Sequence, residues 1–443
     1  MNRIALPYDP KDPLSIEKYA KRLFGRSLRD VLGQDIKQAY TGKGKLGQIL
    51  EDIYFQYKPN SNAEPDFKEA GVELKTSPIK SNSKGLVSKE RLVFNIINYN
   101  EEYKESFLTS SFWKKNQHIL LMFFLYEKDK EDLDHIFKII RLWKFPSSDL
   151  KIIQDDWKKI VNKIKLGKAH EISEGDTLYL GACTKGANNT SLRSQPFSKE
   201  MAMQRAFSLK SKYLNFIIEE SLQKKEELEP VVKSSEEYAE NETFEDLVIK
   251  RFEPFYGSGD DEINRTLNLK PTSAKSKVYL MSKAILGVKK GKIEEFEKAD
   301  ILMKTIRLEH SGNLKESMSF AQIQFKEMIH ENWQDSYWHD ILTKRFFFVI
   351  YQKDEKGKLL LKKVMFWTMP PKDLEIARQF WENTKNKIIQ DDYNNFIKIS
   401  DDRICHVRPK GADSRDLMAT PGGRMEKKKC YWLNSSYIKK IIE

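Results

Sequence analysis

Apolar residues in the first half of the chain gather in short runs that predict the strands of a sheet. The run over residues 119–126 is apolar throughout, which is typical of a central strand buried on both faces. Residues 72–76 alternate between apolar and polar with the period of two that a half-buried strand shows. Similar stretches predict two more strands, over residues 92–97 and 177–183.

Between these strands, apolar residues recur with the spacing of amphipathic helices. Helices are predicted over residues 15–24, 46–57 and 149–165, and from about residue 212 onward. In the second of these helices Glu51 lies off the apolar stripe, so it faces either a site beside the strand or solvent. Helices interleaved with strands predict an α/β fold with a mixed central sheet flanked by helices.

The same pattern starts again in the second half of the chain. Residues 67–76 are echoed by residues 296–305, and the buried run is echoed by residues 346–351. Ser111-Phe112-Trp113 recurs as Ser336-Tyr337-Trp338, which places Lys115 opposite Asp340. Because the matches keep their order along nearly the whole half, the sequence predicts two homologous domains in tandem.

An acidic stretch separates the two copies. Residues 223–243 are rich in Glu and contain Pro230, which is typical of an interdomain linker. The predicted domains are therefore residues 1–222 and residues 244–443, each with the α/β architecture described above.

Composition adds a partner and a compartment to this picture. The 443 residues carry a net charge of +12, which favours a polyanionic partner such as nucleic acid. The apolar runs are too short to cross a membrane, so no membrane association is expected. The three cysteines and the scattered histidines form no zinc or disulfide pattern, and a cytoplasmic protein is expected.

Candidate chemistry centres on the strand at residues 72–76. Pro65 and Gly71 predict a turn before it, and the alternation places Glu73 and Lys75 on one face. Together with Asp66, two carboxylates can hold Mg²⁺, while a lysine can orient a water beside a scissile phosphate. An ordinary solvated strand face with an ion pair is the alternative reading of these residues.

The second copy distinguishes the two readings. There Asp66 is replaced by Glu295 and Glu73 by Leu302, whereas the lysine survives as Lys304. A leucine cannot bind a metal ion, although the apolar core positions of the repeat persist. This selective loss favours a catalytic role for Asp66, Glu73 and Lys75 in the first copy.

The motifs resemble those of a known family. Gly47-Gln48-Ile49-Leu50-Glu51, Asp66-Phe67 and Gly71-Val72-Glu73-Leu74-Lys75-Thr76 are similar to the MutH mismatch-repair endonuclease. The tandem arrangement resembles the Sau-type restriction endonucleases, which are built from two MutH-like domains. The resemblance implies the fold of the PD-(D/E)xK nucleases and a type II restriction endonuclease that cleaves double-stranded DNA at GATC sites with Mg²⁺.

The resemblance also implies roles for particular residues. Asp66 and Glu73 are expected to bind the metal, Lys75 to handle the attacking water and Glu51 to serve as an accessory catalytic carboxylate. DNA contacts are expected from a further set of basic residues, namely Lys115, Lys185, Arg193, Arg408 and Lys410. The first copy lacks the Arg-Pro-Lys pattern present at residues 408–410, so Lys185 and Arg193 follow only from the composition of their loop at residues 184–193.

The second domain is expected to be a regulatory copy that binds DNA without cutting it. One catalytic centre per chain implies that two chains meet on DNA or that the strands are nicked in turn. A restriction system also implies a cognate DNA methyltransferase. The alternatives are a MutH-like enzyme that nicks one strand, a nuclease of this fold with another target, and a DNA-binding protein without catalysis.

Overall fold

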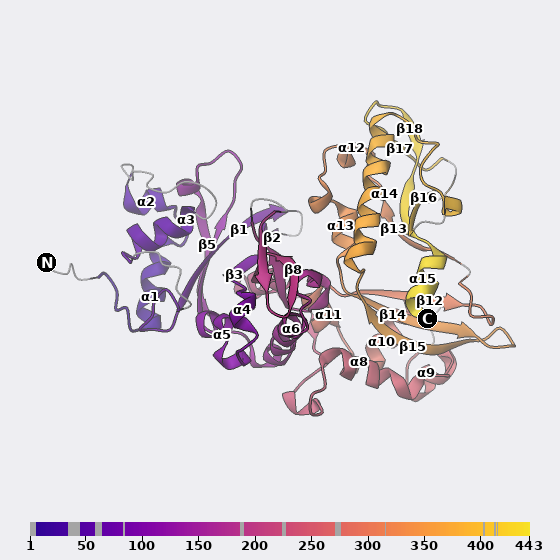
Figure 1. Cartoon of the computed structure of the whole chain (residues 1–443), viewed down its shortest axis with the longest axis horizontal. Coiled ribbons are helices and arrows are strands. Elements are labelled where there is room, and N and C mark those ends of the chain that lie inside the picture. The colour runs from indigo at the N-terminus through magenta and orange to yellow at the C-terminus, as the bar shows by residue number, and fades with distance from the viewer. Residues whose placement is uncertain are drawn as a thin grey trace. The chain divides into compact units, whose positions relative to one another are not determined.

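The computed structural model of the chain divides into two units. It describes residues 6–33, 45–57, 64–82, 85–186, 190–223, 227–270, 276–314, 316–401, 404–411, 413 and 415–443. Unit 1 comprises residues 1–239 together with residues 290–299, and unit 2 comprises residues 240–289 and 300–443 (Figure 1). No helix among the described residues is long and apolar enough to cross a membrane.

Unit 1 is built on a mixed four-stranded sheet. Its strand order is β2-β1-β4-β5, with β1 parallel to β4 and the two outer pairs antiparallel. The bounds are β1 (Glu73–Asn82), β2 (Gly85–Ser88), β4 (Ile119–Leu125) and β5 (Ile136–Trp143). The predicted mixed central sheet is confirmed, and β4 is the predicted internal strand, because its apolar residues lie between two neighbours.

A second, smaller sheet and a hairpin complete the strands of this unit. The sheet has the order β3-β9-β6, and the hairpin pairs β7 with β8. Their bounds are β3 (Leu92–Ile96), β6 (Leu180–Thr184), β7 (Leu192–Gln195), β8 (Ser198–Met203) and β9 (Arg205–Leu209). The helices are α1 (Pro13–Ala20), α2 (Leu28–Leu32), α3 (Lys45–Ile49), α4 (Tyr99–Glu102), α5 (Ser111–Asn116), α6 (Ser147–Lys165) and α7 (Ser211–Ser221).

One hydrophobic core joins β1, β4 and β5 to α1, α2 and α3. Val72 and Leu74 are buried in it, as the alternation predicts. The apolar stripe of the predicted helix at residues 46–57 packs here too, but its backbone changes type midway. Only α3 is an α-helix, and residues Leu50–Tyr54 form a π-helical turn. Such turns widen a helix by one residue and are frequent at functional sites.

Unit 2 repeats the strand order of unit 1, except that β2 has no counterpart among its described residues. Its sheets have the orders β12-β14-β15 and β13-β19-β16, with the hairpin β17-β18. The strands are β12 (Leu302–Leu308), β13 (Met318–Gln322), β14 (Phe346–Lys353), β15 (Leu359–Trp367), β16 (Cys405–Pro409), β17 (Leu417–Ala419), β18 (Met425–Lys427) and β19 (Lys429–Leu433). The helices are α8 (Phe244–Phe252), α9 (Asp260–Thr266), α10 (Lys277–Ile285), α12 (Phe325–Met328), α13 (Tyr337–Leu342), α14 (Pro371–Ile389) and α15 (Ser435–Ile442).

The strand that carries Glu73 and Lys75 has the same pairing in the two units. In unit 1, Glu73 pairs with Ile119 and Lys75 with Leu121. In unit 2, Leu302 pairs with Phe346 and Lys304 with Phe348, again on parallel strands. The pair that contains Glu73 or Leu302 is the first of its parallel strands. Glu73 therefore corresponds to Leu302, and Lys75 to Lys304.

At α5 and α13, however, the alignment of the two copies made from sequence is wrong by one residue. Ser110 and Ser336 are the N-caps of these helices, and each accepts a hydrogen bond from the backbone amide three residues later. This register places Lys115 opposite Ile341 rather than Asp340. Unit 2 lacks the cation at this position in either alignment.

The ten residues 290–299 belong to unit 1 although they lie within the predicted second domain. In this segment β11 (Lys292–Ile293) pairs in parallel with β10 (Leu228–Glu229), and helix α11 (Glu294–Ala299) follows. The carboxylate of Glu295 accepts hydrogen bonds from the backbone amides of Val231 and Val232. The counterpart of Asp66 is therefore engaged in unit 1 and not at β12.

A buried ion pair also ties this segment to unit 1. The Lys298 side chain is 2% exposed, and its Nζ lies 2.9 Å from Asp149 Oδ2 and 2.6 Å from Glu294 Oε1. Tyr213 donates a hydrogen bond to the same Asp149 oxygen. Burial opposes the charge of Lys298, but the two carboxylates outweigh it and raise its pKa.

Candidate active site

A tight turn brings Asp66 beside the first residue of β1. Phe67 and Val72 form an antiparallel bridge with backbone hydrogen bonds in both directions, 2.9 and 3.2 Å long. The turn between them ends at Gly71, whose φ of 65° lies in the left-handed region that glycine adopts without strain. As a result, the two residues just outside the bridge, Asp66 and Glu73, lie side by side.

Reciprocal hydrogen bonds hold this pair. The backbone amide of Asp66 donates to Glu73 Oε2 over 3.1 Å, and the amide of Leu74 donates to Asp66 Oδ2 over 3.0 Å. Each carboxylate keeps oxygen lone pairs for another partner, because one amide satisfies only part of its capacity.

Two lysines converge on the other oxygen of Glu73. Lys75 Nζ lies 2.6 Å from Glu73 Oε1, and Lys115 Nζ lies 3.6 Å from the same atom. The Glu73 side chain is only 2% exposed, so these charges interact away from bulk water. Lys75 reaches the carboxylate from its own strand and Lys115 from α5.

Glu51 completes the cluster from the π-helical turn. Burial first, and then the charges of Asp66 and Glu73, raise the pKa of Glu51 to about 7. Burial is also the main cause that raises the pKa of Glu73 to about 7, with Asp66 adding to it, although Lys75 and Lys115 act in the opposite direction. The structure thus places Glu51 among the carboxylates and not in solvent.

Tyr57 was not foreseen as part of this cluster. Its hydroxyl is buried and has no hydrogen-bond partner among the described residues. Burial and the nearby carboxylates of Asp66, Glu51 and Glu73 raise its pKa. The signal in the sequence was its place at the end of the apolar stripe, where a tyrosine carries a polar atom toward the strand.

These residues fit a hard divalent cation. Among the described residues no group of three His, Cys, Asp or Glu side chains is arranged to hold a metal ion by itself. Mg²⁺, however, is commonly bound by one or two carboxylates and otherwise by water and substrate oxygens. Asp66 and Glu73, with the carbonyl of Leu74 directly after Glu73 in the sequence, supply such a set. Burial first, and then the charge of Asp66, raise the pKa of Glu73, and a bound cation would favour its ionised form.

The basic residues predicted for the first DNA-reading loop lie elsewhere in unit 1. Lys185 follows β6, where its backbone amide donates to the Gln204 carbonyl, and Arg193 is an exposed residue of β7. Residues 187–189 of this loop lie outside the described residues. In the described part of the chain neither side chain forms an ion pair with the carboxylate cluster.

The corresponding basic residues of unit 2 gather on an aromatic ring. The Arg408 guanidinium lies 4.0 Å from the centre of the Trp432 ring, and Lys410 Nζ lies 5.4 Å from it. Trp432 belongs to β19 and pairs with His406 of β16. Sequence reasoning missed Trp432, because only the pairing of these strands reveals its place beside Arg408.

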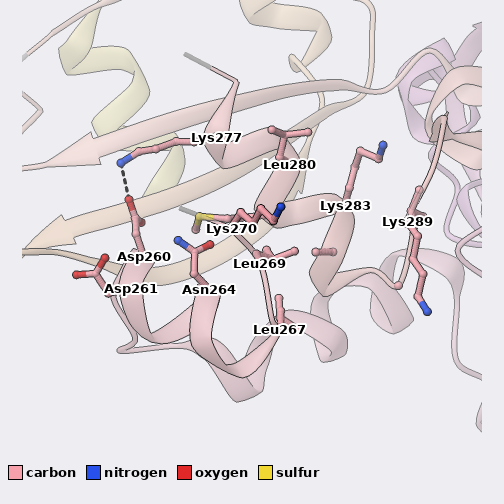
Figure 2. Close-up of a pocket in the computed structure, with 14 residues that line it drawn as sticks. Asp260, Asp261, Asn264, Leu267, Leu269, Lys270, Lys277, Leu280, Lys283 and Lys289 are labelled. Carbon is pink, nitrogen blue, oxygen red and sulfur yellow. Dashed lines mark hydrogen bonds and ion pairs between the residues drawn. The ribbon is translucent and has the colours of Figure 1, made fainter. Parts of the chain in front are cut away.

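A separate pocket of about 660 Å³ lies between α9 and α10 of unit 2 (Figure 2). Leu267, Leu269 and Leu280 contribute apolar surface, and Figure 2 shows the ion pair between Lys277 and Asp260, which is 2.6 Å long. None of the predicted site residues lines this pocket.

Comparisons with known proteins define the class of the molecule. A sequence model of the family described as DNA mismatch repair enzyme MutH matches residues 55–156, which contain Asp66, Glu73, Lys75 and Lys115. A mixed sheet that carries this cluster, together with the match, defines a DNA endonuclease with a restriction-endonuclease-like fold. The type II restriction enzyme Sau3AI of Staphylococcus aureus is 36% identical over 97% of this chain and 98% of its own length. The chain therefore belongs to the family of that restriction enzyme.

MutH proteins match a smaller share of the chain. A DNA mismatch repair protein MutH of Shewanella baltica is 28% identical over 49% of this chain and 98% of its own length. That of Buchnera aphidicola is 30% identical over 35% of this chain and 71% of its own length. The protein is thus a type II restriction endonuclease, a site-specific deoxyribonuclease that binds double-stranded DNA.

Proposed function

We propose that unit 1 hydrolyses phosphodiester bonds at GATC sites with Mg²⁺, and that unit 2 binds a further GATC site without cutting it and thereby promotes cleavage. The observation that carries the proposal is the convergence of Glu51, Asp66, Glu73, Lys75 and Lys115 at one end of β1. The same position of unit 2 has Leu302 in place of Glu73.

Each residue of the cluster in unit 1 has a separate role in hydrolysis. Asp66 and Glu73 would hold the ion, and a bound ion would supply positive charge against the negative charge that develops on the phosphoryl oxygens. Lys75, 2.6 Å from Glu73, orients the attacking water and assists its deprotonation. Glu51, with a pKa raised to about 7, serves as the accessory carboxylate that can take up a proton near neutral pH.

Recognition rests on basic residues in both units. Lys115 contacts the phosphate beside the cleaved bond, and its position 3.6 Å from Glu73 Oε1, the oxygen that Lys75 also contacts, supports this role. Lys185 and Arg193 contact DNA from unit 1, and Arg408 and Lys410 from unit 2. With one catalytic cluster per chain, a double-strand cut requires two chains that dimerise on DNA, or two successive nicks. A methyltransferase in the same system protects host sites.

The first experiment incubates the purified protein with a plasmid of known sequence, with Mg²⁺ and with EDTA. Wild type is expected to give fragments that end at GATC, and both EDTA and Glu73→Ala are expected to abolish them. Glu69→Ala is the matched control, because Glu69 is an exposed carboxylate of the same turn. Defined fragments that end elsewhere would reject the GATC assignment and keep the catalytic cluster. Cleavage by Glu73→Ala at the wild-type rate would reject the cluster.

A further inference from the structure

Unit 2 retains the lysine of the catalytic strand after losing its carboxylate partner. Lys304 takes the place of Lys75, and Leu302 takes the place of Glu73 in the same strand register. The Lys304 side chain is half-buried, and its Nζ lies 4.6 Å from the centre of the Phe320 ring. Among the described residues it has no acidic partner, whereas Lys75 has one at 2.6 Å.

The charge of Lys304 is also close to other positive charges. Burial first, and then the charge of Lys410, lower the pKa of Lys304. Lys410 Nζ donates a hydrogen bond of 2.5 Å to the Ser319 hydroxyl, on the strand that also carries Phe320. Lys304, Lys410 and Arg408 thus form a group of three cations, with Arg408 over the Trp432 ring. None of the three is paired with an Asp or Glu in the described parts of unit 2. Like charges held together in this way favour an anion between them.

The cationic cluster is defined as Lys304, Lys410, Arg408 and Trp432. Lys304 and Lys410 correspond to Lys75 and Lys185 of unit 1, whereas Arg408 and Trp432 are particular to unit 2. Strand pairing shows which residues of unit 1 occupy its positions. In unit 2 Trp432 pairs with His406, and in unit 1 Ser208 pairs with Gly181, so Trp432 corresponds to Ser208. Two residues after His406, Arg408 corresponds to Cys183. Unit 1 therefore has small, uncharged residues where unit 2 has a guanidinium on an aromatic ring.

We propose that Lys304 and Lys410 bind a backbone phosphate of duplex DNA directly, with no metal ion, at the position where unit 1 would hold its ion. This inference rests on the proposed binding of DNA by unit 2. A phosphodiester carries one negative charge and acceptor oxygens, which two ammonium groups can share. The strand β12 itself carries no Asp or Glu, and Asp300, two residues before it, is paired with Lys344 over 2.8 Å. The counterpart of Asp66 is Glu295 of α11, which accepts hydrogen bonds within unit 1.

The consequence is a difference in metal dependence between the two units. DNA binding by unit 2 should persist in EDTA, whereas carboxylates in unit 1 repel phosphate when no cation neutralises them. The test uses the full chain in EDTA, where no cleavage occurs. Binding of a fluorescent duplex containing GATC is titrated at several salt concentrations by anisotropy.

Lys304→Met is expected to weaken this binding roughly tenfold near 0.1 M salt. The slope of log K against log salt should fall in magnitude by about one, because one phosphate contact is lost. Lys304→Arg should keep both values, since it keeps the charge. Lys385→Met is the matched control, because Lys385 also lies over a ring, that of Trp381 at 5.5 Å, on α14. Equal melting temperatures exclude misfolding.

Arg408→Ala separates this inference from the proposed function. If Arg408→Ala weakens binding in EDTA and Lys304→Met does not, unit 2 binds DNA without the phosphate site proposed here. If neither variant changes binding, unit 2 does not bind DNA, and both the inference and the regulatory role are rejected. Wild-type binding that disappears in EDTA also overturns the inference, while GATC cleavage in Mg²⁺ would leave the catalytic proposal intact.

Discussion

The two units share the order of their common strands, and the difference that bears on chemistry lies at the start of one strand. In unit 1, β1 begins with Glu73, and carboxylates and lysines balance one another around it. In unit 2, β12 begins with Leu302, and cations remain without acidic partners in its described residues. The parallel pair β12 and β14 keeps the register of β1 and β4, and Ser336 caps α13 as Ser110 caps α5, so the fold does not require the carboxylates. The comparison teaches that the carboxylates of unit 1 are not needed to form this strand pair, and that the charge of unit 2 suits a polyanion.

The largest expected effect comes from replacing the equivalent lysine in each unit, Lys75 in unit 1 and Lys304 in unit 2. Lys75→Met should lower the rate of cleavage by roughly 10³-fold, because the attacking water loses its orienting group. Lys304→Met should lower it by no more than about tenfold, because only DNA binding by unit 2 is affected. Single-turnover cleavage of a plasmid in Mg²⁺ measures both. Equal losses would show that the two lysines have the same role.

A second prediction concerns stability. Lys298→Met should destabilise unit 1 by about 3–5 kcal/mol, because it leaves Asp149 buried without its cation. In unit 2 the equivalent hydrogen bond runs from Tyr437 to Asp373, and no lysine of the described residues forms an ion pair with Asp373. Lys292→Met in the same segment is the control, since Lys292 is half exposed and lies 3.5 Å from Glu297. Guanidinium unfolding followed by tryptophan fluorescence measures the difference, and equal midpoints for the two variants would contradict the assignment.

The smallest expected effect depends on pH. Burial and Asp66 raise the pKa of Glu73 to about 7, so the carboxyl stabilises the fold below its ordinary pKa of 4.5. That stability is lost as pH rises through about 7. In EDTA, Glu73→Gln should therefore be more stable than wild type at pH 8, by about 1–3 kcal/mol, and not at pH 5. Thermal unfolding across this pH range measures the difference. A gap that stays constant with pH would place the titration elsewhere.

Much of the fold followed from short-range patterns. The apolar run that forms β4 and the alternation that buries Val72 and Leu74 were sufficient to predict the mixed sheet. Gly71 marked the turn because its backbone conformation is unfavourable for other residues. The unit 2 counterpart, Asp300, adopts a φ of 54°, which Asp tolerates better than most residues.

Other features depend on contacts between distant segments, which a sequence pattern does not contain. The π-helical turn that carries Glu51 is a local departure from a regular helical period. The one-residue shift at α13 became visible only through the serine caps. The place of Trp432 beside Arg408 follows from pairing of β16 with β19 and not from spacing along the chain.

The segment at residues 290–299 has a consequence for how this protein can be divided. The repeat suggests that a cut near the acidic stretch would yield two complete copies. Yet these ten residues fold with unit 1, so the chain passes from one unit to the other at 239, at 289 and at 299. A gene fragment that ends at residue 222 omits Lys298 and leaves Asp149 without its ion pair. The limits of the sequence repeat therefore differ from the limits of the folded units. A fragment that contains all of unit 1 would have to include residues 290–299, joined to residue 239 by an engineered linker.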